Sequence, residues 1–207
     1  MIVNTQDNLG MKGHLSISKI FKDGTEELVF DDKNVIVSGF GWSLAYLFSR
    51  TGSDRITDFQ IDRFQVGVSG HQGNQVSSTY ELSGPLSSVA EYVGDGVDSN
   101  VYSFEAYQWK NGVAVNSPTP IYGKIPSSKI SKIDDRSVRY TILLDEDSCN
   151  GLTRDGSDAY LNEIGLFVKN PQADNPECSV LAAYRYFSEI RKTEDFGLIF
   201  RWTISFG

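Results

Sequence analysis

Apolar and polar residues alternate near the start of the chain, which is the pattern of strands with one buried face. Residues 15–21 alternate in this way, and a second apolar stretch at 27–30 follows the turn at 22–25. This turn contains Asp23-Gly24, and an Asp-Gly pair between two strand-like stretches is a strong signal for a β-hairpin. We therefore predict a hairpin here, followed by a short third strand at 34–37.

One stretch shows helical spacing instead. Apolar residues at positions 40, 44, 47 and 48 recur at intervals of three and four. Ser38 is a suitable N-cap, and Gly52 is a suitable stop just past the end. We predict a short amphipathic helix near residues 39–50. The side chains expected to anchor it are Trp42, Leu44 and Phe48.

The middle of the chain is less apolar. Residues 59–68 predict a strand with a break near Asp62-Arg63. Residues 70–99 are rich in Ser, Gly, Asn and Asp and predict a long loop excursion, with a short helix around 86–92. Because long loops in compact domains are often functional, we expect contacts with other molecules in this excursion.

Strand patterns resume after the excursion. The segments expected to be strands are 101–109, 121–125, 137–144, 160–168, 180–187 and 198–206. Many short strands with turn signals between them favour an antiparallel β-sandwich or jelly roll. We predict a mainly all-β fold, with a flexible N-terminal arm at 1–13 and a single domain at 14–207. Its expected core includes Leu166, Phe167, Phe187, Phe200 and Trp202.

Composition adds limits on partners and location. The 207 residues carry a formal net charge of −8, and 40% of them are hydrophobic. The basic residues between 124 and 139 are interleaved with Asp134 and Asp135, unlike the clustered basic residues that bind phosphate backbones, so we expect no nucleic acid partner. No window approaches the roughly 20 apolar residues of a membrane helix, and residues 1–13 lack signal-peptide order, so we expect a cytoplasmic origin and no membrane partner.

The polar side chains give few signals of chemistry. Cys149 and Cys178 are the two cysteines, and two isolated thiols fit a reducing compartment better than a disulfide scaffold, although a bridge stays open. The acidic loop at 145–151 fails the calcium-loop pattern at three positions and is interpreted as a solvated loop. His14 and His71 fit no metal-ligand or nucleophile pattern.

Glu163 lies among apolar residues in the segment 161–167, whose alternation places it on one face with Leu161, Gly165 and Phe167. A carboxylate in such surroundings is a candidate acid with a raised pKa. A structural ion pair with an arginine is the favoured interpretation, because glycosidases need a second carboxylate. The candidate partners are Arg185, Arg191 and Arg201. Gly165 predicts a bulge or the close approach of another backbone.

Aromatic residues near the excursion raise an alternative function. Exposed Tyr and Trp side chains can stack on sugars, and the cluster that suggests this comprises Tyr80, Tyr92, Tyr102, Tyr107 and Trp109. We assign no catalytic, cofactor-binding or metal-ligating residue and expect no cofactor. The chain is expected not to be an enzyme.

Two sets of segments resemble parts of a known class of protein. Near the C-terminus, residues 161–167 read LNEIGLF, 181–187 LAAYRYF, 190–193 IRKT and 198–206 LIFRWTISF. Near the N-terminus, 23–30 read DGTEELVF and 34–37 NVIV, followed by Leu44-Ala45 in the expected helix. These segments resemble the closing and opening strands of small β-rich structural proteins of tailed-bacteriophage virions.

The resemblance implies a non-enzymatic subunit of the virion, assembled in the host cytoplasm, in the tail or baseplate or at a fibre attachment point. It also implies that other virion proteins are the partners and that the chain forms a homo-oligomer. Two alternatives remain: a carbohydrate- or receptor-binding module at a fibre tip, which would bind a host surface glycan, and a capsid decoration or neck or head-fibre protein.

Overall fold

The computed structural model describes residues 10–49, 56–86, 122–154, 157–168 and 179–207. These residues form a nine-stranded antiparallel sheet in the order β4-β3-β9-β10-β2-β1-β11-β6-β5. Its strands are β1 (Lys12–Phe21), β2 (Glu26–Ile36), β3 (Ile61–Gly67), β4 (Gly123–Lys124), β5 (Ile130–Asp134), β6 (Ser137–Leu144), β9 (Leu161–Val168), β10 (Val180–Ile190) and β11 (Phe196–Ser205). The remaining elements are helix α1 (Ser38–Ser49), the short pair β7 (Thr153–Arg154) and β8 (Ser157–Asp158), and 3-10 turns at Ile56–Phe59, Gln72–Asn74 and Ser127–Lys129.

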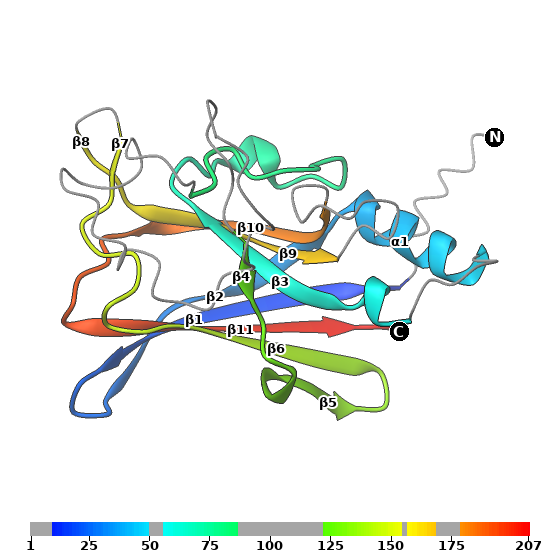
Figure 1. The fold of residues 1–207 in the computed structure, drawn as a ribbon, viewed down its shortest axis with the longest axis horizontal. Coiled ribbons are helices and arrows are strands. Elements are labelled where there is room, and N and C mark those ends of the chain that lie inside the picture. The colour runs from blue at the N-terminus through cyan, green and yellow to red at the C-terminus, as the bar shows by residue number, and fades with distance from the viewer. Residues whose placement is uncertain (1–9, 50–55, 87–121, 155–156, 169–178) are drawn as a thin grey trace, which may run out of the picture.

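The sheet curls so that its two halves face each other. Figure 1 shows β3, β9 and β10 as one layer and β1, β11, β6 and β5 as the other. Strand β2 joins the layers, because it pairs along most of its length with β1 and, at Val35 and Ile36, with β10. The predicted all-β antiparallel class is confirmed.

The predicted hairpin is present, with one difference. The Asp23 carboxylate accepts the backbone N–H of Thr25 at 2.8 Å, and Gly24 has a φ of 84°, which favours glycine. The stretches 27–30 and 34–37, expected as two strands, belong to one strand, β2, apart from Val37. A bulge opposite Ile17 and Ser18 lets β2 stay paired with β1 on both sides of the irregularity.

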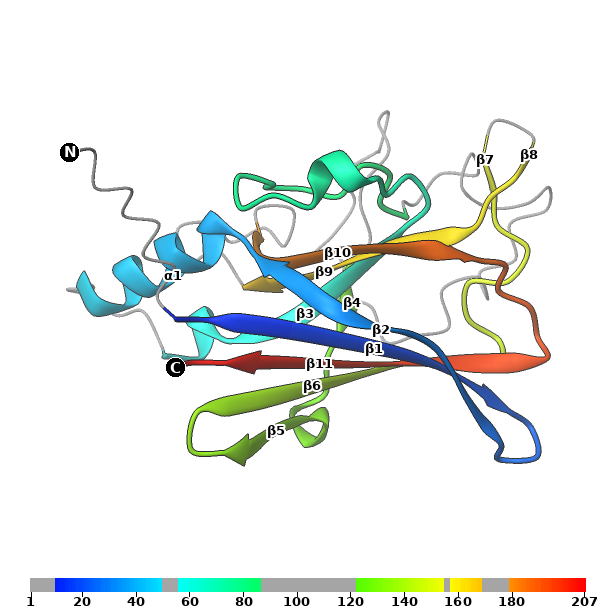
Figure 2. The same cartoon turned by 180° about the vertical axis from the view of Figure 1, so that it is seen from behind.

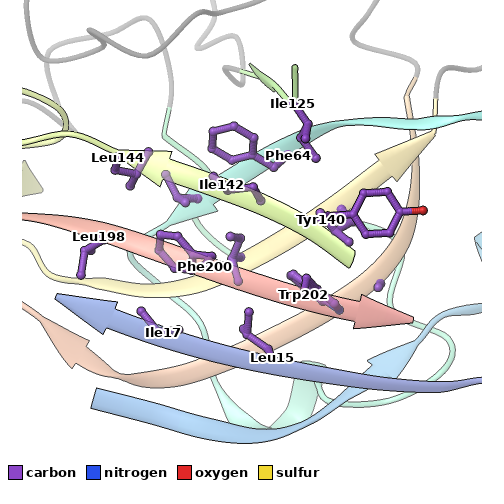
Figure 3. Packing of buried hydrophobic residues seen from close by; sticks show 14 of the residues in the cluster. Leu15, Ile17, Phe64, Ile125, Tyr140, Ile142, Leu144, Leu198, Phe200 and Trp202 are labelled. Carbon is purple, nitrogen blue, oxygen red and sulfur yellow. The ribbon is translucent and has the colours of Figure 1, made fainter. Parts of the chain in front are cut away.

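Side chains from both layers fill the space between them. Trp202 and Phe200 of β11 are completely buried, as are Leu15 and Ile17 of β1. Figure 3 shows them below Phe64, which comes from β3 in the opposite layer. The five residues predicted for the core are all buried, although Phe167 belongs to a second cluster on the outer face of β9 and β10.

The other sequence predictions differ mainly at boundaries. Strand β1 begins at Lys12, so it includes two residues assigned to the N-terminal arm, and the stretch 121–125 contributes just the two residues of β4. The break near Asp62-Arg63 is confirmed as an irregularity in the pairing of β3 with β9. The strand at 101–109, residues 1–9 of the arm and Gly52 lie outside the described residues, as does the helix expected at 86–92 apart from Leu86, which is not helical.

Helix α1 has the predicted position but presents a different face to the body. Phe40 and Ser43 are its buried residues, whereas Trp42 is 40% exposed and Phe48 is 83% exposed. The expectation that Trp42 and Phe48 anchor the helix is therefore wrong, and Leu44 is half-buried. The helix starts close to β10, where a Cβ at Gly39 would collide with the carbonyl oxygen of Leu181. Within the described residues, no helix has the length and apolarity to cross a membrane.

Candidate functional site

The first candidate is Glu163, an ionisable side chain that is enclosed by the protein. It lies on β9 and is completely buried. Its Oε1 accepts the backbone N–H of Gly84 at 2.7 Å, and its Oε2 accepts the N–H of Ser83 and the hydroxyl of Tyr184, each at 3.0 Å. Three donors thus replace the water that a carboxylate loses on burial.

The predicted pairing of Glu163 with an arginine is wrong. The three arginines pair with other carboxylates: Arg185 with Asp32, Arg191 with Asp158, and Arg201 with Glu26. The Glu26 pairing is bidentate and, through hydrogen bonds from Arg201, lowers the pKa of Glu26 to about 2. Two of these ion pairs therefore link strands, since they join Arg185 of β10 and Arg201 of β11 to β2, while Glu163 binds a loop.

The loop that Glu163 holds is the segment 68–86, here called the cover segment. At its ends, the N–H of Val68 donates to the carbonyl oxygen of Gly84 at 2.9 Å, and the N–H of Leu86 donates to the carbonyl oxygen of Val66 at 3.0 Å. The cover segment is thereby closed on itself and tied to β3. The part of the predicted excursion at 70–86 packs against the sheet, and residues 87–99 lie outside the described part of the chain.

Two amides fix the cover segment at further points. Gln75 spans the backbone of β10: its amide donates to the carbonyl of Tyr184 at 3.4 Å and accepts the N–H of Tyr186 at 3.2 Å. The amide of Asn162 on β9 likewise accepts the N–H of Gly70 at 2.7 Å and donates to the carbonyl oxygen of Gly70 at 3.2 Å. Together with Glu163, these contacts hold the cover segment to two neighbouring strands.

An apolar cluster lies beneath the cover segment. Leu82 is buried there against the outer face of β9 and β10; the other buried members of this cluster are Val37, Tyr122, Phe167, Leu181 and Tyr184. Gly165 provides the room, because a Cβ at this position would lie 2.6 Å from Leu181 Cδ1 and 2.8 Å from Leu82 Cδ1. The predicted bulge or backbone approach at Gly165 is thus corrected to a close approach of side chains.

Electrostatics at Glu163 indicate an enclosed structural group. Burial, followed by the charge of Glu163, raises the pKa of Tyr184 above its usual range. The tyrosine hydroxyl therefore stays protonated and keeps donating to the carboxylate. Because Glu163 has no exposed surface and binds two backbone N–H groups of the cover segment, it holds this segment in place.

The acidic loop at 145–151 is organised by a lysine. Lys192 is 3% exposed, and its ammonium donates to the carbonyls of Glu146 and Thr193 and to Asn150 Oδ1 at 2.9–3.1 Å. Burial lowers the pKa of Lys192. No local pattern in the sequence points to Lys192, because its amide partner Asn150 lies 42 positions earlier in the chain. The acidic loop therefore binds the ammonium group of Lys192, a cation that the chain itself supplies.

The remaining candidates are separate from one another. Cys149 is a free, completely buried thiol whose pKa burial raises to about 12, and Cys178 lies outside the described residues. His14 Nε2 lies 3.2 Å from Asp31 Oδ1 on the solvent side, and His71 is exposed in the cover segment. Among the described residues, no group of three His, Cys, Asp or Glu side chains could hold a metal ion.

The aromatic cluster considered for sugar binding is described at one position. Tyr80, at the surface of the cover segment, is 77% exposed. The other members of that cluster, Tyr92, Tyr102, Tyr107 and Trp109, lie outside the described residues.

A second group of exposed apolar side chains lies where α1 meets the C-terminal strand. We call it the helix-end patch and define it as Trp42, Phe48, Ile56 and Phe206, which are 40%, 83%, 65% and 36% exposed. Phe206 contacts Phe40 with a ring separation of 6.2 Å, and Trp42 stacks on Tyr46 at 5.4 Å. Figure 2 shows α1 beside the C-terminus at one end of the molecule, opposite the β1–β2 hairpin.

Comparison with known proteins gives no assignment: no family model, curated protein or solved structure matches the chain.

Proposed function

We propose that the chain is a non-enzymatic structural subunit of a tailed-phage virion, in the tail or baseplate or at a fibre attachment point. It acts by oligomeric assembly and by docking to other virion proteins. The proposal starts from the resemblance of its first and last strands to those of phage structural proteins. In the fold, one segment of each set comes together, because Val35 and Ile36 of β2 pair with Tyr184 and Ala183 of β10.

The helix-end patch is the observation that carries the proposal. Apolar side chains exposed together at one end of a protein mark sites of contact with other molecules. Among the residues that the structure describes, Phe48 is the most exposed large apolar one, and α1 contains no acidic or basic side chain. A helix that lacks a charged, solvent-facing side is typical of a helix that is buried all round.

The use of Glu163 also supports a structural role. An acid of this kind in a catalytic site would face a cleft, whereas this carboxylate has no exposed surface and accepts three hydrogen bonds from the cover segment and Tyr184. The proposal assigns Glu163 to the stability of the subunit and assigns contacts with partners to the surface.

Localisation in particles tests the proposal directly. Tailed-phage particles are purified from the source of the chain, digested for mass spectrometry and labelled for electron microscopy with an antibody against the purified protein. We expect peptides of the chain in the particles and label at one defined place. Intact particles without the chain, with the protein recovered free in the lysate, would overturn the proposal.

A further inference from the structure

Lys192 and Asn150 bring an amine and a side-chain amide together at the acidic loop. The Nζ atom of Lys192 lies 2.9 Å from the Oδ1 atom of Asn150. A carbonyl bond is about 1.23 Å long, so the carbonyl carbon Cγ of Asn150 lies within about 4 Å of the amine. Atoms held about 3–3.5 Å apart are close to attack. A small movement of either side chain therefore brings the amine against the amide carbon.

The backbone of Glu146 fixes the amine and the amide relative to each other. Its carbonyl oxygen accepts a hydrogen bond from Nδ2 of Asn150 and a second one, at 3.1 Å, from Nζ of Lys192. The Asn150 amide is thus held at both ends, by Lys192 at its oxygen and by Glu146 at its nitrogen. Holding two groups in one geometry removes much of the entropic cost of a reaction between them.

Burial prepares Lys192 to act as a nucleophile. The residue is 3% exposed, and its Nζ lies 5.5 Å from the centre of the Phe196 ring. Burial lowers the pKa of Lys192, which raises the share of the neutral amine, the form that carries a free electron pair for attack on a carbonyl carbon. The charges of Asp145, Glu146 and Asp147 act on Lys192 in the opposite sense. Carboxylates at such a site can also accept and return the protons that a transfer reaction moves.

We propose that Lys192 and Asn150 join through an isopeptide bond that forms within the folded chain. Nζ forms a bond to Cγ, the bond between Cγ and Nδ2 breaks, and one proton passes from Nζ to Nδ2, which leaves as ammonia. No electrons are gained or lost, so the reaction needs no oxidant and no second substrate. The structure shows the two side chains in the hydrogen-bonded arrangement that precedes the bond.

The bond would tie the two layers of the sheet together. Asn150 lies in the loop that follows β6, and Lys192 lies in the turn between β10 and β11. Strands β6 and β10 belong to opposite layers, and Figure 1 shows that both end at the same end of the molecule. A bond between residues 42 positions apart also restricts the unfolded chain, as a disulfide does. The inference does not rest on the proposed function, because it concerns the chain by itself.

Mass spectrometry of the purified full chain, taken at intervals after the protein is made, tests the bond. We expect the intact mass under denaturing conditions to fall below the calculated mass by one ammonia. Trypsin should then release residues 140–154 joined to residues 192–201 as one branched peptide, because trypsin does not cleave after an acylated lysine. A chain that keeps its calculated mass and yields 140–154 and 193–201 as separate peptides would overturn the proposal.

Substitutions identify the reacting atoms. Lys192→Arg keeps a cation in the loop but removes the amine, and Asn150→Ser removes the amide, so each should abolish the loss of ammonia. Lys132→Arg is the matched control, because the Lys132 side chain is 65% exposed on β5, and it should leave the loss unchanged. Circular dichroism checks that each variant is folded.

Ring closure at Asn150-Gly151 is the competing source of the same mass change, because an Asn side chain that reacts with the next backbone nitrogen also releases ammonia. Lys192→Arg leaves that reaction intact, so a loss of ammonia that persists in this variant, without a branched peptide in the wild-type chain, would overturn the proposal. The branched peptide is read on the wild-type chain and therefore decides the question even where a variant fails to fold.

Discussion

The outer face of β9 and β10 and the helix-end patch both carry apolar side chains outside the main core, but the first surface is buried and the second is exposed. The first is covered by the chain's own cover segment, so that Leu82 is 3% exposed. At the second, Phe48 remains 83% exposed. Buried polar contacts account for the difference: Glu163, Gln75 and Asn162 satisfy backbone groups of the cover segment or of the strands beneath it.

In this molecule, the apolar face that a loop covers is the one where the polar groups of the loop have hydrogen-bond partners. A loop laid over a sheet loses water from its N–H and carbonyl groups, and each group left unpaired costs about 1–3 kcal/mol. The buried carboxylate of Glu163 removes this cost for two adjacent N–H groups at once. Helix α1 pairs its interior backbone groups within the helix and presents its side chains outward, which suits contact with another folded surface.

The largest expected loss of stability comes from a substitution of the carboxylate that holds the cover segment. Glu163→Ala removes the acceptor for three buried donors and should lower the free energy of unfolding by roughly 3 kcal/mol or more, at ~1–3 kcal/mol for each unsatisfied group. Glu163→Gln is the control, because it retains one acceptor oxygen in the same shape and should cost clearly less. Urea denaturation measures both; equal, small losses would show that the carboxylate does not hold the cover segment.

A matched pair of truncations compares the two regions directly. Leu82→Ala should cost about 2–3 kcal/mol, at the low end of the range of ~2–5 for buried leucines, because a surface loop can settle into the space. Phe48→Ala should change stability by less than ~0.5 kcal/mol in dilute solution, as expected for an exposed site. Similar losses in the two variants would contradict the distinction between a covered and an uncovered surface.

Adding one methyl group beneath the cover segment tests its packing. Gly165→Ala would place a Cβ 2.6 Å from Leu181 Cδ1, and overpacking of this kind costs about 1–3 kcal/mol. In contrast, Gly41→Ala on α1 meets nothing within 4 Å and should stabilise the helix slightly. Thermal unfolding of both variants should therefore shift in opposite directions; a neutral Gly165→Ala would mean that the cluster is loose.

Alkaline pH provides a smaller test of enclosure. Burial raises the pKa of Tyr184, of Tyr140 to about 12 and of Cys149 to about 12, whereas the unfolded chain ionises these groups near 10 and 8.5. At these three groups the folded state then holds more protons than the unfolded state, so their contribution to stability is full below about pH 8 and falls as the pH rises, by up to ~1.4 kcal/mol per unit for each group. The lowered pKa of Lys192 gives the opposite slope, but for one group against three. Unfolding free energies that stay constant from pH 8 to about 11 would contradict this burial.

Local patterns in the sequence predict much of the fold. The Asp23-Gly24 turn, the helix at 39–50 and the strand at 137–144 follow from residues close together in the chain, and the structure confirms them. Alternation also placed Glu163, Gly165 and Phe167 correctly on one face, although Leu161 belongs to the main core.

The failures concern partners that no local pattern specifies. The partners of Glu163 include two backbone N–H groups about 80 positions away, and a backbone group gives no signal in the residue type. The buried face of α1 was misassigned because the helix is apolar or uncharged all round, so that spacing alone does not choose between Phe40 and Phe48. Both features are decided by tertiary packing.

Hydrogen exchange of the full chain at two protein concentrations tests the contrast most directly. Peptides from the cover segment should exchange at the same rate at both concentrations, because the chain itself supplies that cover. Peptides from α1 should exchange more slowly at the high concentration, because the proposed assembly covers this helix. Exchange in α1 that is independent of concentration, or a cover segment that loses protection on dilution, would contradict the account.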